Sequence, residues 1–396
     1  MYNKDMEKLG KQASAIRTLF EYGKAKKKEI GDDKVYDFSI GNPSVASPSI
    51  VNSTLIKLIN EKDSTKLHGY TSASGDDNTK KAIEEYLNKT YNANVSYKDI
   101  YMTCGAAASL AITFNALLNK GEEVIVFAPY FPEYKVFVEK AGGIIDIVKS
   151  DKDFQIDFVD LNKHINKNTK IVIINSPNNP TGVIYSEEKI IKLAKLLEEK
   201  SKLYNHPIYL VSDEPYRELI YTDIKYPFIT RYYKNSIVCY SFSKSLSLPG
   251  ERIGYILLSS DMDNKENVFN AVCGAGRSLG YVCAPALFQQ MVPYCLGYTS
   301  DLNEYKKNLK DLKEMLESIG YEIIKPEGAF YMFAKALEED ANSFSKNAKI
   351  FNLLLVPSDS FGVKGYVRIA YCVSNNQIKA SKTAFENLYK FYQEEK

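Results

Sequence analysis

The sequence predicts an α/β fold in which a large domain holds a mostly parallel sheet between helices and a smaller domain is of α+β type. Between residues 98 and 258 short apolar runs alternate with helical patterns. Strands that read as continuous apolar runs are buried on both faces, which is typical of a mostly parallel sheet. The chain has 396 residues, more than one hydrophobic core usually holds, so we expect two domains.

The expected domain boundaries follow the changes of pattern along the chain. Residues 1–45 would form an N-terminal arm and part of the small domain. Residues 46–290 would form the large domain, and residues 291–396 the small C-terminal domain.

The individual elements follow in chain order. A helical period predicts a helix over residues 13–28, and turn residues interrupt a short strand within residues 36–44. A helix is expected over residues 48–60, with Ser47 as its N-cap and Pro48 as its first residue. The runs expected to form the large sheet are residues 100–103, 123–127, 170–174, 208–211, 236–240 and 255–258. The small domain adds a helix over residues 303–318, strands over 326–333 and 366–370, and a helix over 379–393.

Charge and composition argue against several classes of partner. Lys and Arg number 51 and Asp and Glu 49, so the net charge of +2 predicts neither nucleic acid nor an anionic membrane as partner. No apolar run is long enough to span a membrane, and residues 1–10 lack the apolar stretch of a secretory signal. The six cysteines form no C-x-x-C pair and the three histidines are scattered. We therefore expect reduced thiols, no metal site and a cytoplasmic protein.

Lys244 is the most informative residue of the chain. It follows a run that reads as a buried strand, where desolvation disfavours the charged form of an amine. A neutral amine can form a Schiff base, and the neighbouring Ser241, Ser243 and Arg252 would suit a phosphate. Amine and phosphate together suggest pyridoxal phosphate (PLP) as cofactor, although most lysines are simply solvated surface residues.

Further candidate residues follow other predicted strands, at the edge where ligands bind in open α/β sheets. Asp213 is either a helix N-cap or the carboxylate that pairs with the pyridinium nitrogen of PLP. Tyr216 is either a core residue or a donor to the phenolic oxygen of the cofactor. Asn179 lies in a segment that turn chemistry alone explains, yet its amide could reach the same oxygen.

Three weaker signals concern phosphate, ring and carboxylate binding. Gly105, Ala106 and Ala107 open a helix, whose N-terminal N–H groups either bind phosphate or merely pack closely. Phe131 could stack on a planar ring or belong to the core. Arg368 lies in a predicted strand and needs a partner, which would be either a substrate carboxylate or an internal salt bridge.

Taken together, these motifs resemble the PLP-dependent aminotransferases of class I/II, the aspartate aminotransferase superfamily of PLP fold type I. The resemblance rests on an ordered series made up of residues 179–182, 213–216, 241–255 and Arg368, and it spans nearly the whole chain. It implies a seven-stranded type of sheet in the large, PLP-binding domain. Two departures are Ala106 and Ala107 where relatives often carry a hydroxyl, and Phe131 where many have Trp.

The resemblance also implies a role for each candidate. Lys244 would be the Schiff-base lysine, Asp213 would bind the pyridine nitrogen, and Tyr216 and Asn179 would bind the phenolic oxygen. Arg368 would hold the substrate α-carboxylate beside Asn179. The residues implied to hold the phosphate and the ring are Gly105, Ala106, Ala107, Ser241, Ser243, Arg252 and Phe131.

The same resemblance implies a homodimer with shared active sites. Tyr70 looks like the tyrosine that reaches the phosphate from the partner chain. Gly41 looks like the backbone contact that closes over the substrate.

The reaction expected from this resemblance is transamination between an L-amino acid and a 2-oxo acid such as 2-oxoglutarate. Aspartate leads the candidate donors, ahead of alanine and aromatic amino acids. Arg277 could pair with an acidic substrate side chain, or it could be an interface or surface arginine. A C–S β-lyase would keep the same residues, so the alternative stays open at this stage. A non-enzymatic binding module is disfavoured because the chain keeps Lys244 and has no basic appendage.

Overall fold

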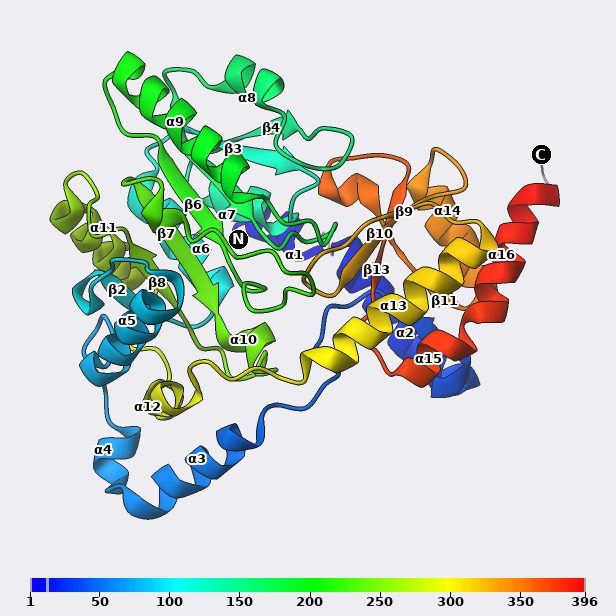
Figure 1. Ribbon diagram of the computed structural model, residues 1–396, viewed down its shortest axis with the longest axis horizontal. Helices are drawn as coiled ribbons and strands as arrows, with labels where there is room; N and C mark the ends of the chain where they lie inside the picture. Colours follow the sequence, from blue (N-terminus) through cyan, green and yellow to red (C-terminus); the bar gives the residue numbers. More distant parts are fainter. Residues whose placement is uncertain (1, 12–13, 395–396) are drawn as a thin grey trace.

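The structure, a computed structural model, describes residues 2–11 and 14–394. Two units lie side by side, one around a seven-stranded sheet and a smaller one around a four-stranded sheet (Figure 1). The expected helix over residues 13–28 is α2 (Ala15–Ile30), and Ala13 lies outside the described residues.

The large sheet has the strand order β2-β8-β7-β6-β5-β3-β4. Strand β8 is antiparallel to both its neighbours, β2 and β7, and all the other strand pairs are parallel, so the prediction of a mostly parallel sheet is confirmed. The strands are β2 (Ile100–Thr103), β3 (Glu123–Ala128), β4 (Ile144–Lys149), β5 (Thr169–Asn175), β6 (Tyr209–Asp213), β7 (Ser236–Ser241) and β8 (Gly254–Leu258).

Strand β4 is the one strand of this sheet that the apolar runs did not predict. It lies at the edge, where Ile144 and Ile147 stay 54% and 40% exposed, and Asp146 interrupts its apolar residues. An edge strand buries less of its surface than a central one, so its sequence carries a weaker signal.

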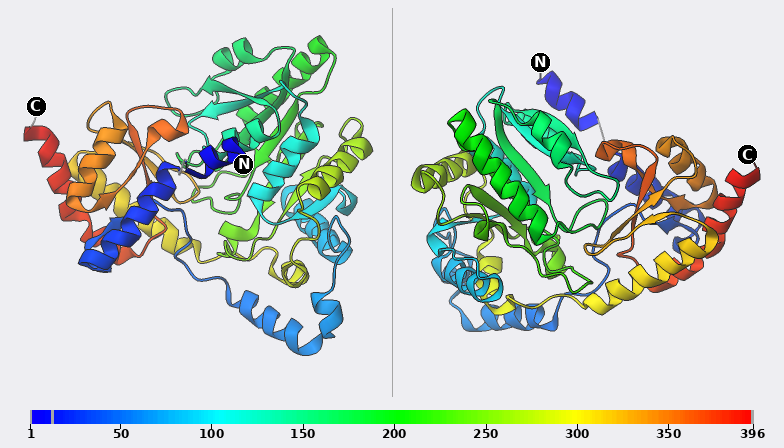
Figure 2. Two further views of the ribbon diagram at one scale, coloured as in Figure 1. Left: turned by 180° about the vertical axis from the view of Figure 1, so that it is seen from behind. Right: turned by 45° about the horizontal axis from the view of Figure 1, so that its top comes forward.

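Helices cover both faces of the large sheet, which explains the continuous apolar runs. Consecutive residues of a strand point to opposite faces. Val124 and Ile125 of β3 are both fully buried, each in a different apolar cluster. One face packs against α6 (Ala106–Leu117), α7 (Glu133–Lys140) and α11 (Lys265–Ser278), seen in the view from behind (Figure 2). The other packs against α5 (Asp77–Tyr91), α9 (Glu187–Tyr204) and α12 (Ala286–Cys295).

The smaller sheet is antiparallel and has the order β12-β13-β10-β9. The long helix α13 leads from the large unit into the small one (Figure 1). The elements of the small unit are α13 (Leu302–Ile319), β9 (Ile323–Ile324), β10 (Tyr331–Lys335), α14 (Ala341–Ala348), β11 (Leu353–Leu354), β12 (Val356–Pro357), β13 (Tyr366–Ala370), α15 (Asn375–Ala380) and α16 (Lys382–Glu394).

The N-terminal part of the chain packs on its C-terminal part. Strand β1 (Tyr36–Asp37) pairs in parallel with β11, and Leu19 of α2 shares an apolar cluster with Leu354. The assignment of residues 1–45 partly to the small domain and the other domain boundaries stay predictions. Helix α12 runs across residue 290, and its Met291 packs in the core of the large sheet. The remaining helices are α1 (Lys4–Lys11), α3 (Ser49–Glu61), α4 (Ser64–His68), α8 (Phe158–His164) and α10 (Phe242–Ser245).

Several element boundaries differ from the prediction, among them those of helix α3, strand β10 and the C-terminal helix. Helix α3 has Pro48 rather than Ser47 at its N-cap position. Strand β10 begins at Tyr331, because the preceding Gly328 donates its N–H to Gly182 of the large unit instead of pairing in the small sheet. The expected closing helix is two helices, α15 and α16, which Ser381 separates.

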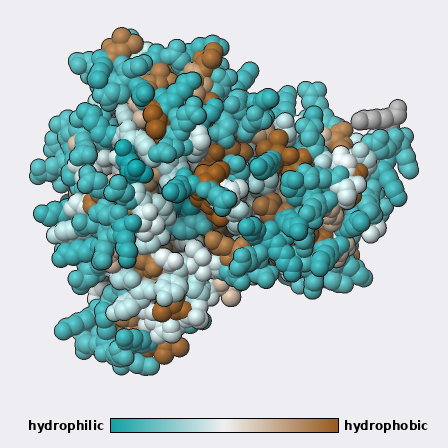
Figure 3. Space-filling view, viewed as in Figure 1, coloured by the Kyte–Doolittle hydropathy of each residue, from teal (hydrophilic) through white to brown (hydrophobic). Residues whose placement is uncertain are grey.

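The face drawn in Figure 3 is mostly hydrophilic, and hydrophobic side chains gather on it where the large and small units meet. None of the helices within residues 2–11 and 14–394 combines the length and apolarity that crossing a membrane requires.

Candidate active site

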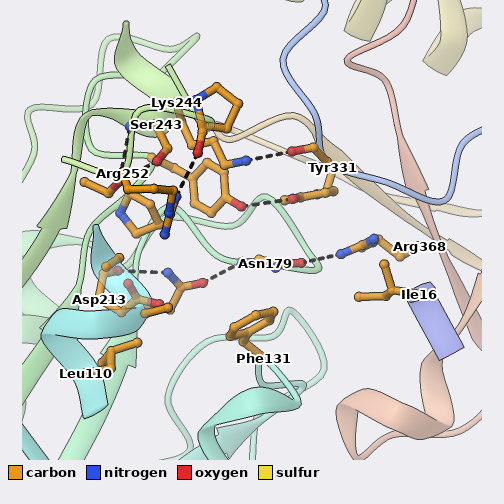
Figure 4. A pocket seen from close by; sticks show the side chains of 18 residues that line it. Ile16, Leu110, Phe131, Asn179, Asp213, Ser243, Lys244, Arg252, Tyr331 and Arg368 are labelled. Atoms are coloured by element: carbon orange, nitrogen blue, oxygen red, sulfur yellow. Dashed lines mark hydrogen bonds between the residues drawn. The ribbon is translucent and has the colours of Figure 1, made fainter. Parts of the chain in front are cut away.

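A cavity of about 280 Å³ lies where the carboxyl ends of β5, β6 and β7 meet the N-terminus of α6 and the side chain of Arg368 from the small sheet (Figure 4). Its size approaches that of small-molecule sites, which run from roughly 300 to 1,000 Å³. Most of the predicted site residues line it. These are Gly41, Ala106, Ala107, Phe131, Asn179, Asp213, Tyr216, Ser241, Ser243, Lys244, Arg252 and Arg368.

Lys244 reaches the cavity from the one-turn helix α10, directly after β7. Its Nζ donates a hydrogen bond of 2.7 Å to the carbonyl of Gly41 and lies 5.4 Å from the ring centre of Phe330. Burial, together with the positive charges of Arg368 and Arg252, lowers the pKa of Lys244 to about 8, although Cys372 opposes the shift. About a tenth of this amine is therefore neutral at pH 7, far more than for a solvated lysine, in the direction that the sequence suggested.

Asp213 ends β6 and is buried. Its Oδ2 accepts a hydrogen bond of 2.6 Å from Tyr134 of α7, while its Oδ1 has no hydrogen-bond partner among the described residues. Burial raises the pKa of Asp213 to about 7, although the hydrogen bond from Tyr134 opposes the rise. A cationic N–H group at Oδ1 would supply the missing partner and reverse this shift.

An anion-binding end forms at the N-terminus of α6. Gly105 caps this helix with φ of 88°, and the guanidinium of Arg252 lies so close that a Cβ on Gly105 would be 2.8 Å from its Nη2. Arg252 Nη2 donates to the carbonyl of Cys104 over 3.2 Å. Ser241 and Ser243 place their hydroxyl oxygens 2.6 Å apart beside it. Helix N–H groups, hydroxyls and a guanidinium are the donors that hold a phosphate.

Arg368 enters from β13 and is almost completely buried. Its Nη1 donates to Asn179 Oδ1 over 3.0 Å, its Nη2 donates to the carbonyl of Ser39, and its Nε has no hydrogen-bond partner among the described residues. No carboxylate of the described chain lies within salt-bridge distance of Arg368, so the alternative of an internal salt bridge is wrong. Figure 4 shows Asn179 between Arg368 and Asp213.

The structure adds residues that the sequence pattern did not single out. Tyr331 lines the cavity and exchanges a hydrogen bond of 2.9 Å with the hydroxyl of Tyr216. Tyr134 holds Asp213, and Ile16 of α2 reaches the cavity from the N-terminal part of the chain. Tyrosines are so frequent here, at 30 residues, that composition gives no reason to prefer one of them. The other lining residues not predicted are Leu110, Asn175, Pro215 and Pro249.

Two predicted residues lie away from the cavity. Tyr70 follows α4 and is 99% exposed. Arg277 is exposed near the end of α11 and does not line the cavity. The predicted role of Tyr70 requires a second copy of the chain, and the predicted roles of both residues stay predictions.

The residues present fit PLP. The unpartnered Oδ1 of Asp213, the donors around Gly105 and the partly neutral amine of Lys244 match a pyridinium nitrogen, a phosphate and an aldehyde respectively. Phe131 faces this space from the other side (Figure 4). Fold and site together define a PLP-dependent enzyme.

Comparison with known proteins gives the family. The chain belongs to the class I and II aminotransferases, whose family pattern matches residues 33–383. It is similar to an aminotransferase from Eubacterium rectale, whose crystal structure is 55% identical, with a TM-score of 0.97 and 99% of each chain covered. The aspartate aminotransferase from Thermotoga maritima is 26% identical, with a TM-score of 0.85 over 98% of this chain and 99% of that one. A probable aspartate/prephenate aminotransferase from Aquifex aeolicus is 28% identical over 94% of this chain and 96% of its own length.

Proposed function

We propose that this aminotransferase moves an amino group between an L-amino acid, with aspartate favoured, and a 2-oxo acid such as 2-oxoglutarate. The carrying observation is that one cavity unites the amine of Lys244, the unpartnered carboxylate oxygen of Asp213 and the buried guanidinium of Arg368. The names of the relatives from Thermotoga maritima and Aquifex aeolicus support aspartate as the donor.

The cofactor would be held at three places. Asp213 would accept from its pyridine nitrogen, the donors at the N-terminus of α6 and Arg252 would bind its phosphate, and Lys244 would carry it as a Schiff base. Asn179 and Tyr216 would donate to its phenolic oxygen. When bound, PLP supplies an electron sink for the negative charge left on the substrate α-carbon.

Arg368 would orient the substrate. Its guanidinium is buried, and its Nε has no hydrogen-bond partner among the described residues. The N–H of this Nε is therefore available to donate to the α-carboxylate. The side chain of Asn179, already bonded to Nη1, keeps the guanidinium in place. Binding the carboxylate there fixes the α-carbon toward Lys244, which reduces the entropy that the reaction must otherwise lose.

Lys244 would be the proton carrier. With a pKa of about 8 its Nζ can accept the proton that leaves the α-carbon and later donate it again at a neighbouring carbon. Gly41, whose carbonyl accepts from this Nζ, would hold the amine in the cavity between these steps. General acid–base catalysis of this kind contributes about 10²- to 10⁴-fold.

The side-chain carboxylate of aspartate needs a further cation. Within the cavity of one chain the cations are Lys244, Arg252 and Arg368, and each already has a proposed role. We therefore assign the additional charge to Arg277 of a second copy, and Tyr70 of that copy to the phosphate. This assignment requires a homodimer with shared active sites. We also propose that the enzyme works in the cytoplasm.

The first experiment incubates wild type and Lys244→Ala with PLP, reduces both with borohydride and measures the mass of each protein. Wild type should gain one covalently bound cofactor and the variant none; equal labelling of the two would refute the role of Lys244. A panel of amino donors with 2-oxoglutarate then measures glutamate formation. Release of pyruvate and ammonia without an acceptor would instead indicate a β-lyase.

A further inference from the structure

Tyr331 stands at the meeting point of the cofactor side and the substrate side of the cavity. It is the first residue of β10 and is buried. Its hydroxyl lies 2.9 Å from that of Tyr216, and its ring centre lies 4.5 Å from the Cζ of Arg368 (Figure 4). Three elements distant in sequence, the loop after β6, strand β10 and strand β13, thus converge on one phenol.

The backbone at Gly41 is shaped around this hydroxyl. A Cβ at position 41 would lie 1.9 Å from Tyr331 Oη, so any other residue there would displace the phenol. The same Gly41 accepts the hydrogen bond from Lys244 through its carbonyl. The position of Tyr331 is therefore enforced by the segment that also holds the amine.

Hydrogen-bond chemistry decides which of the two hydroxyls, that of Tyr216 or that of Tyr331, is the donor. A phenol has one proton to donate and can accept in return. If Tyr216 donates its proton to the phenolic oxygen of the cofactor, Tyr331 must be the donor in the 2.9 Å hydrogen bond and Tyr216 the acceptor. In such a chain each hydrogen bond polarises the next, which strengthens it by roughly 10–30%.

We propose that Tyr331 is a positioning residue of the aminotransferase, which donates to Tyr216 and so strengthens the hydrogen bond from Tyr216 to the cofactor. This inference rests on the proposed function, because it requires bound PLP. The bond from Tyr216 stabilises negative charge on the phenolic oxygen, and that charge is greatest when the proton of the Lys244–cofactor linkage has left. Tyr331 would thereby lower the pKa of that linkage.

The test is Tyr331→Phe, which removes the hydroxyl and keeps the ring. The pH titration of the visible absorption of the PLP-loaded protein reads the linkage directly. We expect its proton to be held about 1.3- to 4.5-fold more tightly in the variant, since roughly 10–30% of the strength of a charged hydrogen bond is lost. Tyr371→Phe is the matched control, because its buried hydroxyl bonds the carbonyl of Ala329 and the side chain of Tyr221, and Tyr371 does not line the cavity.

The double variant Tyr216→Phe/Tyr331→Phe decides whether Tyr331 acts through Tyr216. We expect no further shift beyond that of Tyr216→Phe alone. An unchanged titration in Tyr331→Phe, a shift equal to that of the Tyr371 control, or full additivity in the double variant would overturn the proposal. A rise in the KM for aspartate with an unchanged titration would also overturn it, since Tyr331 would then act on the Arg368 side.

If the proposed function itself were wrong, the titration would give a result different from those that overturn the role of Tyr331. In that case wild type itself would show no titratable linkage with PLP, whatever residue stands at position 331. Thermal unfolding of each variant shows whether it is folded under the conditions of the titration.

Discussion

Replacing Asp213 by asparagine tests whether the site is built for a cationic partner that the protein alone lacks. Burial raises the pKa of Asp213 from its ordinary value of 3.8 to about 7. A carboxyl whose pKa is higher in the folded state stabilises the fold fully at low pH, and that stability is lost as the pH rises toward 7. The cofactor-free protein therefore carries a buried, incompletely paired charge at neutral pH.

The size of this effect on stability follows from the pKa shift of Asp213. At about 1.4 kcal/mol per pKa unit, ionising Asp213 costs the cofactor-free fold about 4 kcal/mol above pH 7, of which about 3 kcal/mol develops between about pH 5 and pH 8.5. Asparagine keeps the acceptor for Tyr134 but leaves an amide N–H₂ at the unpartnered position, which costs about 1–3 kcal/mol at every pH. The pH-dependent part is thus the diagnostic quantity.

The assay is urea unfolding of cofactor-free wild type and Asp213→Asn at about pH 5 and about pH 8.5. Between about pH 5 and about pH 8.5, we expect the unfolding free energy of the variant to rise by about 3 kcal/mol relative to that of wild type. When PLP is bound, wild type should be the more stable of the two proteins. The variant lacks the charge that pairs with the pyridinium nitrogen and should bind PLP at least about tenfold more weakly. Asp340→Asn, at an exposed helix N-cap, should show no such pH dependence. An equal difference in stability at both pH values would refute the reasoning.

Three further predictions concern the other buried charges. Lys244→Met should stabilise the cofactor-free protein by up to about 3 kcal/mol at pH 7, and the gain should vanish near pH 10.5, because a pKa lowered to about 8 penalises the fold only while the amine is charged; a pH-independent difference in urea unfolding would contradict this. Arg368→Lys should raise the KM of the amino donor about 10- to 100-fold, since lysine cannot replace the planar fork, and an unchanged KM in steady-state kinetics would exclude Arg368 from substrate binding. Arg217→Met should cost about 3–5 kcal/mol in urea unfolding, because it leaves Glu214 buried without the guanidinium that now lies 3.1 Å away; a loss below about 1 kcal/mol would contradict the pairing.

All strands of the large sheet except β4 could be predicted, because they are buried on both faces. Such burial gives a continuous apolar run in the sequence, and β2 has the predicted bounds, as does β13 of the small sheet. Edge strand β4 and the N-cap at Pro48 were not found, since neither depends on a dense local pattern. The sequence predicts a strand over residues 326–330, whereas the backbone there contacts the large unit through the N–H of Gly328, which donates to Gly182.

The candidate site was predictable in its residues more than in their connections. Lys244 and Asn179 follow strands and Asp213 ends one, and the carboxyl ends of parallel strands meet at one edge of the sheet. The bond between Tyr216 and Tyr331 joins residues 115 positions apart, and the one from Tyr134 to Asp213 joins residues 79 apart. No local pattern reports such a pairing.

By itself, the sequence determined the α/β class, the strands, the buried lysine and the order of motifs that identifies a PLP enzyme, because each depends on residues close together in the chain. Only the tertiary structure decided what each polar group meets: among the described residues, Oδ1 of Asp213 and Nε of Arg368 have no hydrogen-bond partner, and a second tyrosine lies behind Tyr216. The physical reason is that desolvation and hydrogen bonding depend on groups from distant parts of the chain. Tyr134 meets Asp213 once the large unit has folded, whereas Arg368 and Tyr331 meet Asn179 and Tyr216 only once the two units have packed against each other.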